Sequence, residues 1–338
     1  MPRPPAFDHH LHFGPDDPAL RGFQEVVLSV TDLERWVDLF ERVFGWVTLT
    51  RQASGPELRG LWSLGPEVSI REAVLHQPGD REGFLRLVSF GGVARQQIRS
   101  AAQTWDTGGI FDVNLRARDL PALFRALEAA GWNGLTAPHR YVFGPYDVSE
   151  VLMRGPDGVV LALMQRFAPP LEGFDAMGTT SRFFNSSVIV RDMAAARDFY
   201  VRQLGFTPFF RTAGDRRTAE TNVLGIPPSI NPTVTVPIDI VRPDPAGTGS
   251  VEYLRLEELP GLDFADRAQP PNLGILLYRF PVRDAAAYAA TLEGRGVALH
   301  APLTELDLPP YGRVRTFAVR SPDGVWLEFL QLLAPPAG

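Results

Sequence analysis

The chain has 338 residues, of which 45% are hydrophobic and 21% charged, and its formal net charge is −6. This acidic balance argues against nucleic acid as a partner, and the absence of cysteine excludes disulfides, thiol chemistry and cysteine-bound zinc. No apolar run reaches the ~18 residues of a membrane span, and the N-terminus lacks the apolar core of a signal peptide. We therefore expect a cytoplasmic protein of about two domains without membrane contact.

Residues 1–21 form an N-terminal arm that carries three of the six histidines, within the stretch FDHHLHFGPDD. Histidines two residues apart on an extended segment share a face. His9, His10 and His12 therefore fit a metal-binding arm or a lid over a neighbouring site. A surface arm of unrelated use is the simpler interpretation.

Four segments of the chain repeat one layout, in two pairs. In the first pair, Asp32 and Asp192 lie 160 positions apart, and each opens a helical pattern. In the second pair, Asp119 and Asp284 lie 165 positions apart. Internal repeats of this length define the architecture before any single motif does. The four modules cover residues 22–90, 108–167, 183–259 and 272–333.

Each module is predicted to run from a strand through a helix into two or three further strands. Thr31 and Glu34 form a capping-box pattern at the first helix. Glycine follows the last helical turn at Gly45, Gly131 and Gly205, where a residue in the left-handed conformation ends a helix. The later strands are separated by glycine and proline, as turns require.

A Pro-Asp-Gly turn precedes the last strand of the second and fourth modules. Proline sets the entry angle of such a turn, and glycine tolerates positive φ. The strand after the turn is apolar except for Glu328 in the fourth module, whereas the second module has Ala162 at this position. A carboxylate on a strand that carries Trp, Leu and Phe requires a partner or a function. Glu328 is therefore the first candidate for a site residue.

The repeated motifs resemble the vicinal oxygen chelate superfamily, which includes glyoxalase I, the extradiol dioxygenases and the bleomycin and fosfomycin resistance proteins. The resemblance rests on SVTDLERWVDLFERVFGW, IVRDMAAARDFYVRQLGF and SPDGVWLEFLQ, and it spans residues 22–333. It implies an α+β fold in which four βαβββ modules pair into two open barrels. We expect consecutive modules to pair, which gives an N-terminal barrel at 22–167, a linker at 168–182 and a C-terminal barrel at 183–333.

The resemblance also implies a divalent metal held between paired modules by side chains from first and last strands. The corresponding first-strand positions carry Glu25, Asp112, Asn185 and Leu277, and the last-strand positions carry Arg86, Ala162, Arg255 and Glu328. The assignments of Arg86 and Arg255 depend on strand register, because a slip by one residue turns a side chain to the other face.

Of the two His and one Glu of an extradiol iron site, only the Glu is present at these positions, as Glu328, so a standard iron-dependent dioxygenase is not expected. Glu25 and Asp112 are hard carboxylate ligands suited to Mg²⁺ or Mn²⁺. Alternatively, they pair with Arg86 as a buried charge cluster, because an arginine at a ligand position repels a cation. We assign no cofactor and leave a divalent metal (Fe, Mn, Mg or Zn) open.

The expected catalytic group is Glu328, acting as a general base with Asn185 or Arg255 as oxyanion partner and Tyr311 nearby. Trp326 shares the strand face of Glu328, and Tyr146 occupies the position equivalent to Tyr311, so both are expected to contact substrate. The alternative for Glu328 is a salt bridge to Arg255.

These observations favour a small-molecule enzyme with lyase or isomerase chemistry on an oxygenated apolar or aromatic substrate. The proposed step is proton abstraction next to a carbonyl or phenol. One alternative is a non-catalytic sequestering protein like the bleomycin-resistance members. Another is a metal-dependent enzyme with displaced ligands, completed by the N-terminal histidines. A homodimer is left open.

Overall fold

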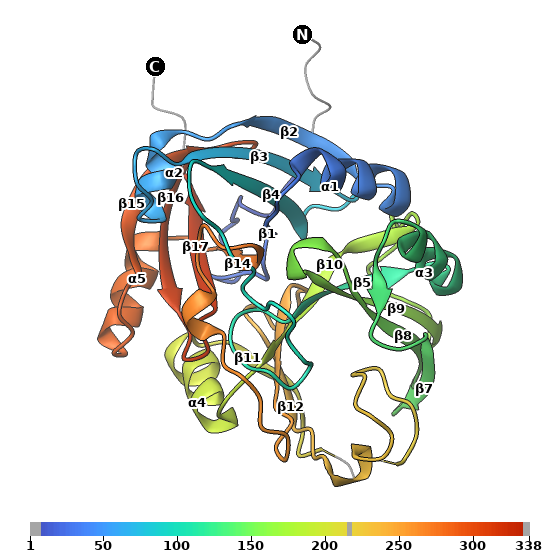
Figure 1. Cartoon of the computed structure of the whole chain (residues 1–338). Helices are drawn as coiled ribbons and strands as arrows, with labels where there is room; N and C mark the ends of the chain where they lie inside the picture. The colour runs from blue at the N-terminus through green and yellow to red at the C-terminus, as the bar shows by residue number, and fades with distance from the viewer. Residues whose placement is uncertain (1–7, 215–217, 334–338) are drawn as a thin grey trace.

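The computed structural model describes residues 8–214 and 218–333. Its strands form two strongly curled sheets, and the main helices lie on the outside of the curls (Figure 1). The strands therefore enclose two separate interiors. This confirms the α+β fold of four repeated modules.

The first sheet contains the strands of modules one and four, and we call it the terminal barrel. Its strand order is β15-β16-β17-β14-β1-β4-β3-β2. The bounds are β1 Glu25–Ser29, β2 Val47–Ala53, β3 Ser69–His76, β4 Phe84–Gly91, β14 Gly274–Pro281, β15 Ala301–Leu308, β16 Gly312–Arg320 and β17 Trp326–Leu332. Its helices are α1 Leu33–Leu39 with its π-helical continuation η1 Phe40–Phe44, α2 Pro56–Leu61 and α5 Ala285–Gly294.

The second sheet contains modules two and three, and we call it the central barrel. Its strand order is β11-β12-β13-β10-β5-β9-β8-β6, and β7 pairs with β8. The bounds are β5 Asp112–Ala117, β6 Asn133–Gly134, β7 His139–Phe143, β8 Tyr146–Arg154, β9 Val160–Ala168, β10 Thr180–Ile189, β11 Thr207–Thr212, β12 Ile238–Arg242 and β13 Ser250–Leu254. Its helical segments are α3 Leu120–Ala129, η2 Pro156–Gly158, α4 Met193–Arg197 with η3 Asp198–Gln203, η4 Asn231–Thr233 and, in the connection to module four, η5 Ala265–Arg267.

The expected pairing of consecutive modules is wrong. First strands meet antiparallel in both barrels, but β1 pairs with β14 and β5 pairs with β10. The connection from module one to module two runs beside the connection from module three to module four, since Ile98 donates its backbone N–H to the carbonyl of Leu273 at 2.8 Å. The strands β9 and β10 also extend into the predicted linker at 168–182.

Four aspartates fix the starts of the main helices. The side chains of Asp32, Asp119, Asp192 and Asp284 each accept a backbone N–H from the first turn, which satisfies donors that the helix itself leaves unpaired. The predicted capping box at Thr31 and Glu34 is wrong. The Thr31 hydroxyl donates to Asp157 at 2.5 Å, and Glu34 forms ion pairs with two arginines, Arg51 and Arg71.

The Pro-Asp-Gly turns hold neighbouring modules together. Asp157 is buried and accepts hydrogen bonds from Thr31 and from the Trp36 indole at 3.0 Å. Asp323, in the equivalent turn, accepts the backbone N–H of Arg191 at 2.9 Å. Each turn thus ties the last strand of one module to the helix start of the module before it in sequence. The repetition of this motif has a structural cause.

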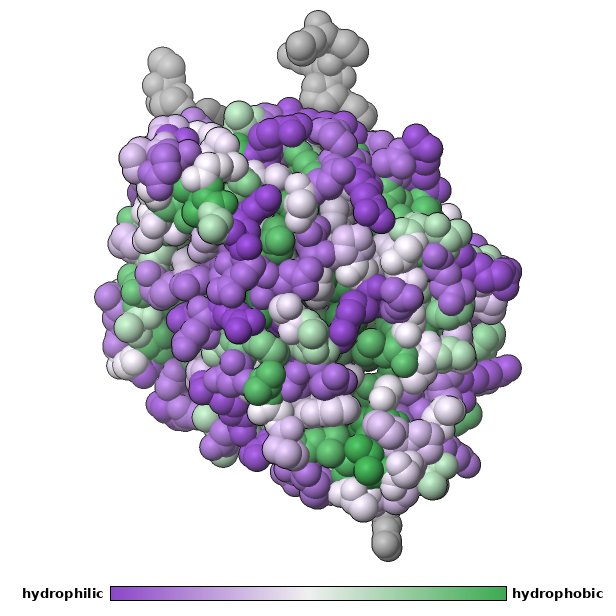
Figure 2. Space-filling model, viewed as in Figure 1, coloured by the Kyte–Doolittle hydropathy of each residue, from purple (hydrophilic) through white to green (hydrophobic). Residues whose placement is uncertain are grey.

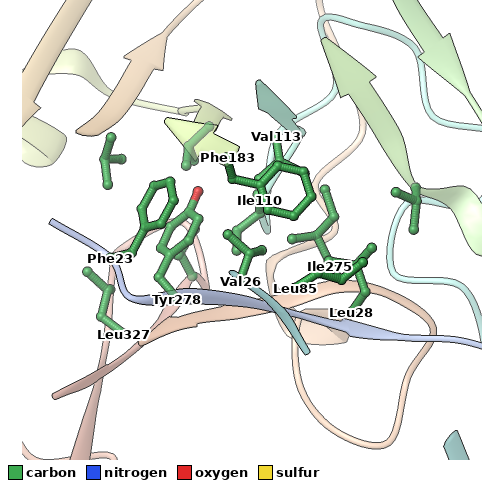
Figure 3. Packing of buried hydrophobic residues seen from close by; sticks show 14 of the residues in the cluster. Phe23, Val26, Leu28, Leu85, Ile110, Val113, Phe183, Ile275, Tyr278 and Leu327 are labelled. Atoms are coloured by element: carbon green, nitrogen blue, oxygen red, sulfur yellow. The ribbon is translucent and has the colours of Figure 1, made fainter. Parts of the chain in front are cut away.

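A continuous hydrophobic core lies between the outer faces of the two sheets. Phe23, Val26 and Tyr278 from the terminal barrel meet Val113 and Phe183 from the central barrel (Figure 3). The Tyr278 hydroxyl is satisfied at 2.7 Å by Ser186. In the described part of the chain, no helix is long and apolar enough to cross a membrane.

Candidate active site in the central barrel

The curl of the central barrel encloses a cavity of about 760 Å³, which we call the central cavity. Side chains from β5, β8, β9, β10, β12 and β13 line it. In the view of Figure 1 this barrel occupies the lower part of the molecule, and hydrophobic surface gathers there in Figure 2. A cavity of this size accommodates a small organic molecule.

Strand alternation determines which side chains face the cavity. On β5, Asp112, Asn114 and Arg116 point inward, whereas Val113 and Leu115 join the core between the barrels. The same period brings Tyr146, Val148, Glu150 and Leu152 of β8 and Ser250, Glu252 and Leu254 of β13 to the cavity.

Three carboxyl groups form one layer of the cavity wall. Asp112 accepts the backbone N–H of Ser187 at 3.2 Å, and Glu150 accepts the Tyr141 hydroxyl at 2.6 Å. Glu252 accepts the amide N–H of Asn185 at 3.1 Å. The other end of that amide is also fixed, because the Asn185 carbonyl accepts the Ser250 hydroxyl at 2.6 Å. The carboxyls are therefore held by neutral donors, not by cations.

This environment makes the carboxyls weak acids. Burial, together with the charge of Glu150, raises the pKa of Asp112 to about 7. Burial and the charges of Asp112 and Glu150 raise the pKa of Glu252 to about 8. Burial likewise raises the pKa of Glu150, although the Tyr141 hydroxyl and Arg116 oppose the shift. Both Asp112 and Glu252 can thus gain or lose a proton near neutral pH, as acid–base catalysis requires.

Arginines face the same cavity at the other end of the strands. Arg116 is 7% exposed, and its guanidinium lies 4.1 Å from the centre of the Phe184 ring. Burial and the charge of Arg166 lower the pKa of Arg116 to about 10. Arg166 and Arg242 line the cavity as well, and they stack on the rings of Tyr146 and Phe209 respectively.

Four charged side chains, Glu25, Arg86, Arg279 and Glu328, meet inside the terminal barrel, and we call them the buried quartet; Glu72, also buried, pairs with Arg86 at 2.8 Å. Arg86 and Arg279 each donate to Glu25 at 2.7 Å, and Arg279 donates to Glu328 at 2.6 Å. All four are at most 1% exposed. Further donors complete the network, since the Tyr311 hydroxyl binds Glu25 at 2.8 Å and the Trp62 indole binds Glu328 at 2.6 Å.

The structure does not bring the predicted catalytic residues together. Glu328 and Tyr311 lie in the terminal barrel and Asn185 lies in the central one, because the modules pair differently from the prediction. Arg255 follows the end of β13, and its charge acts on Asp192. The expected Glu328–Arg255 salt bridge is wrong, since Arg279 is the partner of Glu328.

The remaining predicted residues also divide between the barrels. The cluster of Glu25 with Arg86 is confirmed, but Asp112 belongs to the other barrel and takes no part in it. Trp326 is buried in the terminal barrel, with its ring edge-on to His300. Tyr146 lines the central cavity, so contact with a ligand stays a prediction for this residue.

Glu252 is the main cavity residue that the sequence prediction missed. In the register of the structure it lies beside Ser187, as Arg86 lies beside Val27 in the terminal barrel. It therefore occupies the last-strand position that was assigned to Arg255. The sequence contained a usable signal, because Val-Glu-Tyr-Leu at 251–254 matches Leu-Glu-Phe-Leu at 327–330.

The residues at the family's ligand positions do not fit a divalent metal. In the terminal barrel, one of the four positions carries a guanidinium group, Arg86, and a second guanidinium, Arg279, lies two residues after the Leu277 position; together they already bind both carboxylates. Within the described residues of both barrels, no three His, Cys, Asp or Glu side chains converge as metal ligands. The internal hydrogen bonds of Asn185 and Glu252 agree with this.

The N-terminal arm lies against the terminal barrel. His9 stacks on His12 and meets the ring of Tyr311 edge-on, with centroids 5.0 and 5.5 Å apart respectively. Burial and the charge of His12 lower the pKa of His9 to about 4. His10 contacts Glu82 at 3.2 Å. The arm thus packs beside the terminal barrel, and the predicted metal site that it would complete is not formed by these contacts.

Comparison with known proteins agrees with the fold. The chain is similar to glyoxalase I from Zea mays, with 14% identity, coverage of 92% of each chain and a TM-score of 0.58. It is also similar to a putative dioxygenase from Bacillus subtilis subsp. subtilis str. 168, with 10% identity, coverage of 95% of this chain and 87% of that one, and a TM-score of 0.58. At such identities the likeness shows the fold alone.

No curated protein sequence matches the chain significantly. The family model for the Glyoxalase/Bleomycin resistance protein/Dioxygenase superfamily matches residues 22–163 and 182–329. These two matches cover both barrels and most of the chain. The chain therefore belongs to the Glyoxalase/Bleomycin resistance protein/Dioxygenase superfamily.

Proposed function

We propose that this protein is a small-molecule enzyme that performs lyase or isomerase chemistry in the central cavity, with Glu252 as the general acid–base. One observation carries the proposal. Glu252 faces a ligand-sized cavity, and its pKa is raised by burial and nearby carboxylates to about 8. A carboxyl group with such a pKa can exchange a proton with a bound molecule near neutral pH.

The surrounding residues support this role. The Asn185 amide donates to Glu252 and is itself fixed by Ser250, so the carboxyl group is held in one orientation. In the proposed step, ionised Glu252 takes a proton from a carbon next to a substrate carbonyl. The electron pair moves to the carbonyl oxygen as an enolate.

The proton transfer is measurable without knowledge of the complete reaction. We would incubate the protein in D₂O with pyruvate, phenylpyruvate, acetophenone and 2-hydroxyacetophenone and follow loss of the C–H signals by proton NMR. We expect at least one compound to exchange faster than in buffer, and Glu252→Gln to lose about 100-fold or more of that rate. Glu257→Gln, an exposed acid just after the same strand, is the control and should keep the rate. Equal exchange by wild type and Glu252→Gln would refute the assignment.

A second candidate function is sequestration without chemistry. The apolar part of the cavity wall favours it, with Phe111, Leu152, Leu224, Val236 and Leu254 among the lining residues. Such a protein would bind members of the same panel tightly but would catalyse no deuterium exchange. Binding without exchange, at a rate equal to that of buffer for every compound, would support this function over the first.

A further inference from the structure

We propose that the ligand of the central cavity carries an anionic head group on a flat apolar body, and that Arg116 binds the anion. This inference rests on the proposed function to the extent that the central cavity is the ligand site. It adds the class of ligand and a residue that determines specificity. Carboxylates and phosphates share the required chemistry, because both accept hydrogen bonds from a guanidinium group.

Arg116 is buried, and part of its guanidinium group is unpaired in the protein. Its side chain is more than nine-tenths buried, and its Nε has no hydrogen-bond partner. One Nη contacts the sulfur of Met164, and the guanidinium stacks on Phe184. Within the described residues Arg116 forms no ion pair. The charge of Glu150 acts on Arg116, but the two form no ion pair. A buried guanidinium without a carboxylate in direct contact is costly to maintain, and an anionic ligand would supply that contact.

Among the described residues, four other buried arginines of the same chain show the contrast, of which Arg99 has no ion pair but donates to three backbone carbonyl groups. Arg86 and Arg279 bind carboxylates at 2.6–2.8 Å in the terminal barrel, and Arg182 binds Asp80 at 2.8 Å. Arg116 differs from them because its open side is the central cavity.

The cavity wall carries three positively charged side chains. Arg116, Arg166 and Arg242 all line the cavity, and none of the three forms a salt bridge within the described residues. The carboxyls on the wall offset these charges only in part at neutral pH, since burial raises the pKa values of Asp112 and Glu252 to about 7 and 8 and also raises the pKa of Glu150, whose charge acts on Arg116. The cavity is therefore suited to a negative group.

Aromatic rings line the cavity beside these arginines. Each of the three guanidinium groups lies on an aromatic ring, and the rings of Tyr146, Phe184 and Phe209 belong to the cavity lining. Aliphatic side chains, Val148, Ile238 and Ile240, complete this part of the wall. Flat aromatic faces favour a planar apolar ligand, and about 760 Å³ is room for one or two rings with substituents.

Isothermal titration calorimetry with matched pairs of compounds tests the inference. We would titrate wild type with benzoate, phenylacetate, cinnamate and phenyl phosphate, and with the neutral benzamide, phenylacetamide, cinnamamide and benzyl alcohol. We expect at least one anion to bind at least tenfold more tightly than its neutral partner. Arg116→Met should weaken that anion by about 10- to 100-fold and leave the neutral partner within about threefold. Arg116→Lys should recover part of the loss.

Two further variants guard against a folding defect. Arg242→Met removes a less buried arginine of the same wall and should weaken the anion by a smaller factor. Arg140→Met removes an exposed arginine of β7 that pairs with Asp147 and should change nothing. The inference is overturned if no anion binds better than its neutral partner, or if Arg116→Met leaves the affinity for a bound anion unchanged.

The two proposals fail separately. Anion binding that depends on Arg116, without deuterium exchange in any compound, would retain the ligand class and refute acid–base catalysis. Deuterium exchange that depends on Glu252, with equal affinity for anions and neutral analogues, would retain the catalysis and refute the ligand class.

Discussion

Four corresponding positions in the two barrels carry different chemistry. The register of the first and last strands relates each position of the terminal barrel to one of the central barrel: Glu25 to Asn185, Arg279 to Asn114, Arg86 to Glu252, and Glu328 to Ala162. The four positions of the terminal barrel carry two carboxylate and two guanidinium groups, whose charges neutralise one another. The four positions of the central barrel carry two amides, one carboxyl group and one alanine. These side chains leave room for the central cavity, and the carboxyl group of Glu252 has no cationic partner among the described residues.

The segment that follows β2 in module one differs from the segment that follows β11 in module three, and this adds to the contrast between the barrels. In the terminal barrel, α2 places Trp62 inside, where its indole binds Glu328 and its ring packs in a cluster with Leu58, Leu61 and Phe90. The corresponding part of module three has no α-helix within its described residues, and Leu224 and Val236 line the cavity there. Thus the same strand plan gives a filled interior in one barrel and a ligand-sized cavity in the other.

The largest effect on stability should come from breaking the buried quartet. Arg279→Met leaves Glu25 with one cationic partner fewer and Glu328 with none from the quartet, both fully buried. We expect the free energy of unfolding to fall by about 3–5 kcal/mol, measured by urea denaturation. Arg313→Met, at a half-exposed arginine whose ion pairs are 3.8 and 3.9 Å long, should cost less than about 1 kcal/mol. Equal effects of the two variants would show that the quartet has no special role.

A smaller effect should follow from a change at Trp62. Trp62→Phe keeps an aromatic ring in the cluster and removes the 2.6 Å hydrogen bond to Glu328. Because a hydrogen bond to a buried charge is lost, we expect a fall of about 1.5–3 kcal/mol in the free energy of unfolding. Trp46→Phe, which removes an indole hydrogen bond of 3.0 Å to the neutral hydroxyl of Thr180, is the matched control and should cost less. A larger cost at Trp46 would contradict a charged network in the terminal barrel.

The sequence was sufficient to predict the four modules, because local features determine them. The aspartates at the helix starts and the Pro-Asp-Gly turns act within or next to their own module. The pairing of modules could not be predicted in the same way. Every first strand can pair antiparallel with another first strand, so the repeats permit several pairings. The choice depends on how the connections at Ile98 and Leu273 run beside one another.

The prediction of the site was limited by the same uncertainty. The inference that Glu328 needs a partner was sound, but its partner Arg279 lies two residues beyond the position considered on that strand. The sequence analysis assigns the last-strand position of module three to Arg255, which lies three residues after Glu252, and so does not identify Glu252. Around Arg116 polar and apolar residues alternate as on any half-buried strand, so the sequence does not single it out. Only the folded structure shows that Arg116 has no ion pair within the part of the chain that it describes.

The two barrels should also respond to pH in opposite directions. Burial alone would raise the pKa of Glu25, but the charges of Arg86 and Arg279 outweigh it and hold the pKa below its ordinary value of 4.5. The stability that Glu25 contributes is therefore complete above pH 4.5 and is lost as the pH falls further. In the central barrel, Glu252 has a pKa of about 8 in the folded state, against an ordinary value of 4.5.

For Glu252 the folded state binds the extra proton between these two values, so the free energy of unfolding falls as the pH rises from about 4.5 to about 8. One such group changes it by at most about 1.4 kcal/mol per pH unit. Glu252→Gln should flatten this part of the stability profile, measured by urea denaturation at each pH, and Glu257→Gln should leave it unchanged. If the profile of Glu252→Gln were as steep as that of wild type, the carboxyl would titrate as an ordinary surface acid, and the central barrel would lose the group that sets it apart from the terminal one.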